Sequence, residues 1–172
     1  MSRQLLIMRH AKSAWDTGAP TDFERPLAAR GQRDAPRMGR WLLSEDLVPD
    51  HVVSSPATRA RETVTLVCET LGFKRKRIVW DARIYGADTD ELLEVLAEVP
   101  KKAKTVLLVG HNPGLEFLSS FLANSVPQSD SVFESGLVRT ATVVQLKMPE
   151  DWSTLQAGCA SLITIQHPAD LS

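Results

Sequence analysis

Alternating apolar runs and helical patterns along this sequence predict an α/β layer structure. Leu5–Met8 and Thr105–Val109 are apolar runs with the length and composition of buried strands. A shorter run at Val52–Val53 has the same character, and each of the three is followed by a turn toward a helix. No internal repeat, low-complexity segment or linker divides the chain. Its 172 residues are therefore expected to form one domain, residues 1–172.

The first predicted strand leads through a loop into a long helix. Polar residues, one glycine and one proline fill the loop over Lys12–Arg25, and a helical pattern follows over about Leu27–Leu43. Pro36 lies inside that pattern, where it removes an amide donor and crowds the preceding turn. It either kinks the helix or marks its true start, and the sequence leaves both possibilities open.

The second predicted helix follows Ser54 and has clear boundary signals. Ser55 is a candidate N-cap, Pro56 suits the first helical position, and Gly72 suits the residue after the last turn. One apolar stripe at helical spacing is made by Ala60, Val64, Val67 and Leu71.

The second half of the chain continues the alternation. Asn112 is the candidate cap of a helix that starts at Pro113, after the strand Thr105–Val109. A polar loop is expected over residues 124–136. The remaining elements are a strand at Arg77–Trp80, a helix at Thr89–Val99, and strands at Ala141–Leu146 and Ser161–Gln166.

Composition limits the environment and the partners. The formal net charge of −1 gives no overall attraction to nucleic acid or to an acidic membrane. Cys68 and Cys159 have no zinc-site spacing and suggest buried thiols in a reducing compartment. The first apolar run is too short for a secretory signal, and no run approaches the roughly 18 residues of a membrane span. We therefore expect a cytoplasmic protein without a nucleic-acid or membrane partner.

Histidine or arginine residues follow three of the predicted strands. Arg9 and His10 follow the first, Arg59 lies in the first turn of the helix after the second, and His111 follows Thr105–Val109. Open α/β sheets bind ligands at the carboxyl ends of their strands. Two arginines and two histidines at such strand ends predict a site for a phosphoryl group.

These residue types suit phosphoryl transfer. The guanidinium groups of Arg9 and Arg59 can hold non-bridging phosphate oxygens with paired hydrogen bonds, and nearby helix N-termini add amide donors. A neutral imidazole can attack phosphorus, so His10 is the candidate nucleophile, and neighbouring arginines disfavour its protonation. His111, which comes from another strand, is the candidate donor to the phosphate oxygens. No cluster has metal-ligand spacing, so neither a metal nor another cofactor is expected.

Three other features are expected to have no catalytic role. His51 and His167 lie at strand edges without a matching partner pattern, which favours structural roles. The basic run Lys74–Arg77 follows a helix end and lacks interleaved aromatic residues, so it is interpreted as a solvated turn. The chain has no GxxxxGK[ST] loop, which excludes a P-loop nucleotide site by motif.

Three segments resemble the signatures of a known family. Leu6–Ser13 (LIMRHAKS), Ser54–Thr63 (SSPATRARET) and Val109–Pro113 (VGHNP) are similar, in order, to those of the histidine phosphatase superfamily. Within it, the short chain and the segment Asp22–Leu27 (DFERPL), followed by Arg30–Gly31, resemble the small SixA-type phosphohistidine phosphatases. The resemblance spans nearly the whole chain. It implies a three-layer α/β/α sandwich similar to that of phosphoglycerate mutase.

The resemblance also implies roles for individual residues. It places a phosphohistidine intermediate on His10 and a phosphate pocket at Arg9, Arg59 and His111. Ser13, which closes the first signature, is a further candidate for substrate binding.

The sequence departs from the larger family members at their general acid. There a glutamate after the third strand protonates the leaving oxygen, but the corresponding position here falls at or near Gly86. Such an acid contributes typically 10²–10⁴-fold for an alkoxide, whereas imidazole leaves more readily. The remaining candidates are more simply explained as loop carboxylates or a helix cap: Asp88, Asp16, Asp22 and Glu24. The departure favours phosphohistidine over an alkyl phosphate ester as the substrate.

A second departure concerns Asp16, which aligns with an asparagine that touches phosphate in the mutase branch. A carboxylate facing phosphate would repel it, so we expect Asp16 to turn away or to pair with Arg25 or Lys12.

The sequence therefore predicts a metal-independent hydrolase that removes phosphate from phosphohistidine on a protein, such as a phosphotransfer domain in signal transduction. One alternative is a general phosphatase for small or aryl phosphomonoesters, which would need a carboxylate from Asp88 or the 16–24 loop. Another is an inactive phosphate-binding module, which would form no covalent intermediate. The sequence leaves the oligomeric state open, and also whether apolar residues of the 124–136 loop anchor it or form an interface.

Overall fold

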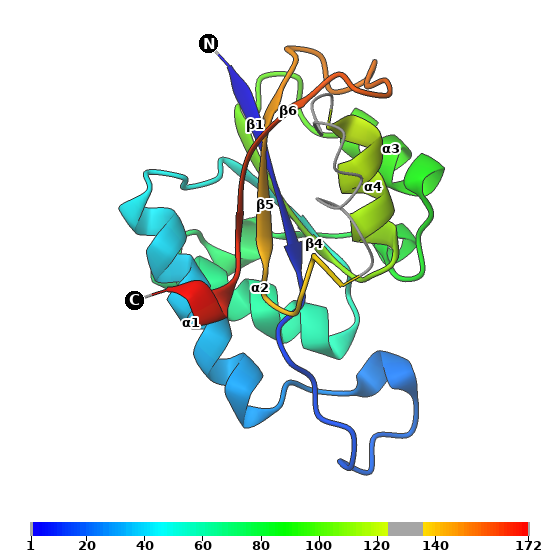
Figure 1. Ribbon diagram of the computed structural model, residues 1–172. Helices are drawn as coiled ribbons and strands as arrows, with labels where there is room; N and C mark the ends of the chain where they lie inside the picture. The colour runs from blue at the N-terminus through cyan, green and yellow to red at the C-terminus, as the bar shows by residue number, and fades with distance from the viewer. Residues whose placement is uncertain (1, 124–135, 172) are drawn as a thin grey trace.

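The computed structural model describes residues 2–123 and 136–171, and their backbone forms a sheet with helices on both faces (Figure 1). The sheet has six strands in the order β3-β2-β4-β1-β5-β6. Neighbouring strands are parallel from β3 to β1, whereas β5 runs antiparallel to β1 and β6 antiparallel to β5. The strands are β1 (Arg3–Arg9), β2 (His51–Ser54), β3 (Val79–Trp80), β4 (Thr105–Gly110), β5 (Val143–Met148) and β6 (Ser161–Gln166).

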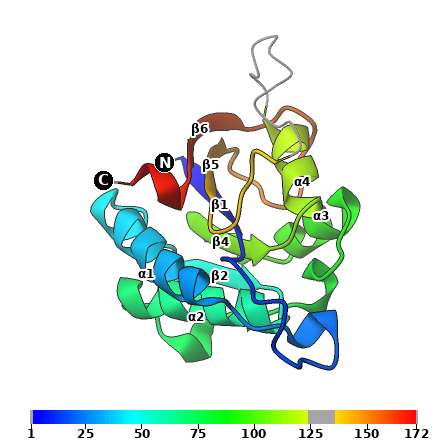
Figure 2. The same ribbon diagram turned by 60° about the horizontal axis from the view of Figure 1, so that its bottom comes forward.

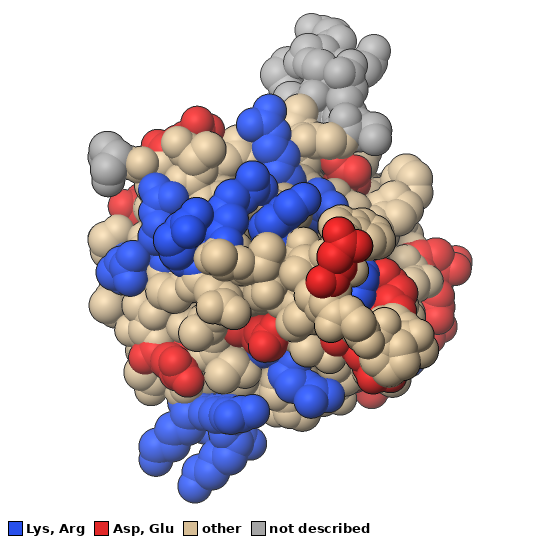
Figure 3. Space-filling view, turned by 90° about the horizontal axis from the view of Figure 1, so that it is seen from below, with Lys and Arg blue, Asp and Glu red and all other residues tan. Residues whose placement is uncertain are grey.

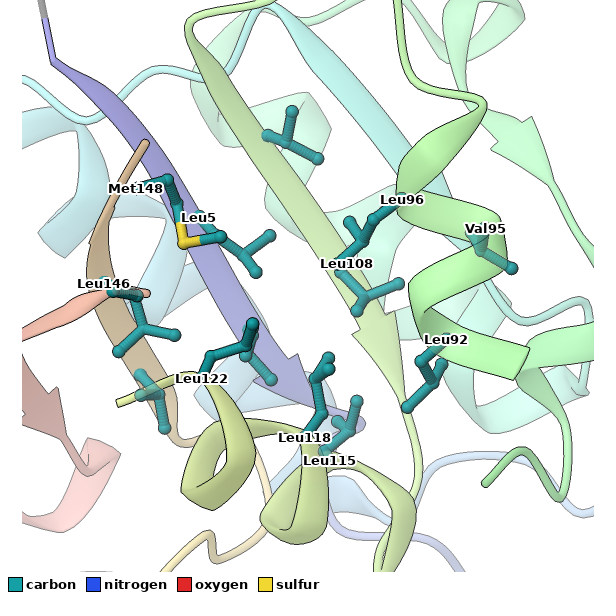
Figure 4. Packing of buried hydrophobic residues seen from close by; sticks show 14 of the residues in the cluster. Leu5, Leu92, Val95, Leu96, Leu108, Leu115, Leu118, Leu122, Leu146 and Met148 are labelled. Atoms are coloured by element: carbon teal, nitrogen blue, oxygen red, sulfur yellow. The ribbon is translucent and has the colours of Figure 1, made fainter. Parts of the chain in front are cut away.

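Two helices cover each face of the sheet, which gives the three layers that the sequence predicted (Figure 2). Helices α1 (Ala29–Ser44) and α2 (Thr58–Leu71) pack on one face, and α3 (Thr89–Ala97) and α4 (Gly114–Leu122) on the other. The alternation of β1 explains the two cores, since successive strand side chains point to opposite faces. Leu6 and Met8 join the core under α1 and α2, whereas Leu5 and Ile7 join the core under α3 and α4 (Figure 4).

Pro36 lies inside α1, and the helix continues through it to Ser44. The missing amide would have bonded the carbonyl of Gln32, an exposed residue in the first turn of the helix. Met38 and Leu42 are fully buried against the sheet and hold the following turns in place. The interpretation that Pro36 marks the start of the helix was wrong, because the helix starts seven residues earlier, at Ala29. The other interpretation, a kink at Pro36, stays a prediction.

Two predicted helix starts were wrong, by two residues in α2 and by one in α4. Helix α2 is capped by Ala57 rather than Ser55, whose hydroxyl accepts a hydrogen bond from the Ala57 amide at 3.2 Å outside the helix. The αL residue Gly72 ends the helix as predicted. Helix α4 starts at Gly114 with Pro113 in the cap position, so Asn112 is not the cap. Extended or turn backbone at the two strand exits explains both shifts.

The parallel strands bring their carboxyl ends to one edge of the sheet. Arg9 at the end of β1 pairs with Gly110 at the end of β4, and Ser54 at the end of β2 pairs with Val109. The loop after β1 folds back there, because the Lys12 carbonyl accepts a hydrogen bond from the Ala28 amide at 2.8 Å. Gly31 permits this approach, since a Cβ at that position would collide with the same carbonyl. The carboxyl ends of β1, β2 and β4 therefore lie next to one another.

Candidate active site

The two predicted histidines lie side by side at the edge of the sheet. The ring centroids of His10 and His111 are 5.2 Å apart. Arg59, in the first turn of α2, donates from Nε to Nε2 of His10 at 3.4 Å. His10 and Arg59 are each only 6% exposed. The structure thus brings together three of the four principal residues that the sequence singled out.

The His10 ring is held in one tautomer. Its Nδ1 lies 2.7 Å from the carbonyl oxygen of Ala11, and a carbonyl can only accept, so Nδ1 carries the proton. Nε2 therefore keeps its lone pair and faces Arg59. The buried Thr63 fixes this turn, because its hydroxyl accepts from the Ala11 amide at 2.9 Å and donates to the Arg59 carbonyl at 2.7 Å.

Burial keeps both imidazoles neutral at physiological pH. It lowers the pKa of His10 to about 4, opposed by the Ala11 carbonyl and reinforced by the charge of Arg59. It lowers the pKa of His111 to about 3, and the proximity of His10 and Arg59 adds to this effect. The sequence anticipated a neutral His10 from its arginine neighbours, but burial is the larger cause.

These pKa shifts predict the titration of the protein. We expect the His10 and His111 ring signals in NMR spectra, assigned by substituting each residue, to titrate below pH 5. Because unfolded histidines bind protons near pH 6.5 and these two do not, the unfolding free energy should fall as pH drops from 6.5 toward 4. A titration midpoint near 6.5 for His10 would contradict the buried, neutral nucleophile.

His111 and Arg9 are positioned by the segments next to the sheet edge. Nε2 of His111 lies 2.8 Å from the Ser55 hydroxyl, and the Tyr85 ring meets the His111 ring edge to face at 5.3 Å. Arg9 donates from Nη1 to the Val138 carbonyl at 3.2 Å. Two nitrogen atoms are buried without a hydrogen-bond partner among the described residues: Nε of Arg9 and Nδ1 of His111. Donor capacity therefore remains unused in the residues predicted to hold phosphate.

Asp22 holds the guanidinium of Arg59 from the opposite side. Its Oδ2 accepts from Arg59 Nη2 at 3.0 Å and from the Tyr85 hydroxyl at 2.7 Å, and its backbone carbonyl accepts from Arg59 Nη1 at 2.8 Å. Arg25 donates to the other carboxylate oxygen at 3.0 Å. The Tyr85 hydrogen bond, with those of Arg25 and Arg59, holds the pKa of Asp22 well below its usual range. Asp22 thus stays anionic and lacks the proton that a general acid needs.

The other acid candidates have structural roles or lie outside the network. Asp88 caps α3 and forms a capping box with Glu91. Glu24 accepts from the Thr21 hydroxyl at 3.2 Å, and Asp16 is exposed and makes no ion pair with Arg25 or Lys12 among the described residues. Gly86, at the expected acid position, has φ of +73°, a conformation that favours glycine.

Ser13 is buried, and its hydroxyl makes no hydrogen bond with His10 among the described residues. Its hydroxyl accepts from Arg25 Nη1 at 2.8 Å, and the Trp15 ring lies 3.7 Å from the same guanidinium. Ser13 therefore supports Arg25, which in turn holds Asp22. Substrate contact by Ser13 stays a prediction.

Sequence reasoning missed three residues of this network: Tyr85, Ser55 in its contact with His111, and Thr63. Tyr85 carried a signal, because it is the single tyrosine of the chain and follows a strand. The hydroxyl contacts of Ser55 and Thr63 depend on how distant segments pack, which no local pattern encodes.

The family comparison agrees with this arrangement. The family model described as histidine phosphatase superfamily (branch 1) matches residues 5–88. A solved structure from Nakamurella multipartitia, provisionally named phosphohistidine phosphatase SixA, is 35% identical, with a TM-score of 0.80 over 98% of this chain and 97% of that one. The chain belongs to the histidine phosphatase superfamily. The residues matched by the family model include His10 and Arg59.

Two further relatives cover most of this histidine phosphatase. An uncharacterized protein of Mycobacterium tuberculosis is 34% identical over 94% of this chain and 99% of its own length. The phosphohistidine phosphatase SixA of Escherichia coli is 25% identical over 81% of this chain and 85% of its own. The phosphoglycerate mutase-like fold expected from the resemblance is confirmed. Membership of the family supports a phosphatase activity.

The described residues hold neither a metal-ligand cluster nor a membrane-spanning helix. No group of three or more His, Cys, Asp or Glu side chains within residues 2–123 and 136–171 could hold a metal ion. In the same part of the chain, every helix is too short or too polar to cross a membrane.

Proposed function

We propose that this protein is a phosphohistidine phosphatase that works through a covalent intermediate on His10. One observation carries the proposal: a neutral, buried imidazole with its Nε2 lone pair beside Arg59, in a site whose nearby carboxylate, Asp22, is held anionic. Such a site offers a nucleophile and positive charge without a proton for the leaving group. It therefore suits a substrate whose leaving group needs no strong acid.

In the first step, Nε2 of His10 attacks phosphorus in line with the bond to the substrate imidazole. The phosphorus–nitrogen bond of the substrate breaks as the new bond to Nε2 forms. A substrate ring that carries a solvent proton on its other nitrogen departs as neutral imidazole. Arg9, Arg59 and His111 stabilise the charge on the three transferring oxygens.

In the second step, water attacks the phosphoryl group on His10 and the bond to Nε2 breaks. The proton that Nδ1 shares with the Ala11 carbonyl makes His10 itself leave as a neutral ring. The attacking water gives its proton to the departing phosphate. Both steps therefore use the same tautomer and need no metal ion.

The substrate class is tested by comparing phosphate release from a phosphohistidine peptide and from an aryl phosphate. We expect a kcat/KM at least about 10²-fold higher for the peptide, the lower end of what a missing general acid costs. Equal or better turnover of the aryl phosphate would replace this proposal with the general phosphatase. Binding of phosphate without turnover of either substrate would leave the inactive module.

Asp22 is proposed to position Arg59, and Asp22→Asn tests this role. We expect kcat for the phosphohistidine peptide to fall about tenfold, because Arg59 loses an anchor that fixes its geometry. Inhibition by inorganic phosphate should not weaken, because the substitution also removes the Asp22 carboxylate, which competes with phosphate for the Arg59 guanidinium. Glu24→Gln, which neutralises a carboxylate of the same loop, is the matched control and should keep wild-type kcat.

The leaving group separates positioning from acid catalysis. If Asp22 donated a proton, Asp22→Asn would slow aryl phosphates with poor leaving groups far more than those with good ones. A uniform loss across a series of aryl phosphates supports the positioning role, and a steep dependence on the leaving group overturns it.

A further inference from the structure

A row of arginines lies along one side of α1. Arg30, Arg33 and Arg37 line a cavity of about 470 Å³. It lies between α1, the segment before β5 and the segment after β6. Arg139 lines the same cavity from the opposite wall, beside His167. Figure 3 shows one group of Lys and Arg side chains in the upper left part of the face seen from below and another at its lower edge, with acidic side chains elsewhere on the same face. Although the protein has a net charge of −1, the lining of this cavity holds four arginines and one carboxylate.

This concentration is unfavourable for the isolated chain. Arginines spaced three and four residues apart on a helix are neighbours, and like charges at these spacings destabilise it by a few tenths of a kcal/mol per pair. Asp34 is the single carboxylate in the cavity lining; it lies 3.7 Å from Arg30 and 3.4 Å from Arg37. Arg33 and Arg139 make no ion pair among the described residues. The cavity therefore carries more positive charge than it neutralises.

The cavity adjoins the active site. Arg30 donates to the Thr140 hydroxyl at 3.3 Å, and the next residue, Ala141, donates its amide to the carbonyl oxygens of Arg9 and His10 at 3.1 Å. Thr140 in the cavity wall is therefore next in sequence to a residue that contacts the backbone of the proposed nucleophile.

We propose that this arginine cavity docks acidic residues that flank the phosphohistidine of a protein substrate. This inference rests on the proposed function and names the partner for the same site. From Arg30 to Arg37, the cavity arginines of α1 span seven residues and about 10 Å of helix. That length exceeds a single phosphate and matches a stretch of acidic protein surface. Complementary charge would steer such a substrate and set its orientation.

The test uses two synthetic phosphohistidine peptides that differ only in their flanks, which are glutamate-rich in one and serine-rich in the other. We expect wild-type kcat/KM to be about tenfold higher for the acidic peptide at low salt, and the preference to shrink in 0.5 M salt, roughly as screening requires. Arg33→Gln with Arg139→Gln should reduce the preference to less than about threefold. The wild type and this arginine-cavity variant should hydrolyse a small phosphoramidate, which has no flanking residues, equally well.

Lys74→Gln with Lys76→Gln is the matched control, because it removes two charges from the turn at the far end of α2 from Arg59. It should keep the full preference for the acidic peptide. The inference is wrong if the wild type does not discriminate between the two peptides, or if the arginine-cavity variant (Arg33→Gln with Arg139→Gln) discriminates as well as the control does.

Binding separates this inference from the proposed function. The same two peptides without the phosphoryl group can be labelled and followed by fluorescence anisotropy, which needs no turnover. Tighter binding of the acidic peptide by the wild type than by the arginine-cavity variant supports docking even if neither phosphopeptide is hydrolysed. Tighter binding of a single-stranded RNA of equal charge, or of vesicles with anionic lipid, would overturn the assignment to a protein partner.

Discussion

Replacing His10 with alanine should lower phosphate release from a phosphohistidine peptide by at least about 10³-fold, because the proposed route forms its covalent bond at Nε2 and no other nucleophile is in place. His111, whose Nε2 contacts the Ser55 hydroxyl at 2.8 Å, is expected to act as a donor to the phosphate oxygens and not as a second nucleophile. The residual rate would come from substrate binding and charge stabilisation alone. Phosphate release is measured under single-turnover and steady-state conditions.

Two controls accompany this substitution. His51→Asn removes a half-buried histidine from the start of β2, at the opposite end of the strand from the site, and should keep wild-type turnover. Thermal unfolding followed by circular dichroism establishes that the His10→Ala protein is folded. A folded variant that retains more than a tenth of wild-type activity would exclude His10 as the nucleophile.

Replacing Arg59 with alanine should lower kcat/KM by about 10²–10³-fold, the usual cost of removing one donor that stabilises a developing charge. Arg59 is buried, and its Nε lies 3.4 Å from Nε2 of His10. Arg59→Lys keeps the charge but not the planar pair of donors, so it should restore only part of the loss. Steady-state kinetics on the phosphohistidine peptide measures all three proteins.

Arg61→Ala is the matched control for Arg59. Arg61 lies on the same helix, is exposed, and hydrogen-bonds only the Pro56 carbonyl at 3.1 Å among the described contacts. Its loss should change kcat/KM less than about twofold. An equal effect of the two substitutions would mean that Arg59 acts through the stability of α2 rather than on phosphate.

The sheet edge was predictable because it follows from short-range pattern and a general rule. Apolar runs located β1 and β4, and parallel strands place their carboxyl ends together, so His10 and His111 had to be neighbours. Helix starts were less predictable: Ser55 and Asn112 are good capping residues, but both lie in turns that leave the sheet before the helix begins. Capping preference is local, whereas these turns are set by packing.

The carboxylate of Asp22 shows a second limit of the sequence. Four acidic residues stood as candidate acids, and nothing local distinguished Asp22 from the others. Only the fold of the loop after β1 brings Asp22 to Arg59 and Tyr85, from segments 37 and 63 residues away. The same contacts keep it ionised, which turns a candidate acid into a positioning residue.

The central claim is tested most directly by trapping the intermediate. A peptide carrying labelled phosphohistidine is mixed with excess protein, quenched in alkali, where phosphohistidine survives, and the digested protein is examined by mass spectrometry. The proposed mechanism predicts a transient phosphoryl group on His10, formed before phosphate release and absent from His10→Ala. Turnover without label on the protein, or with the label on His111, would contradict it.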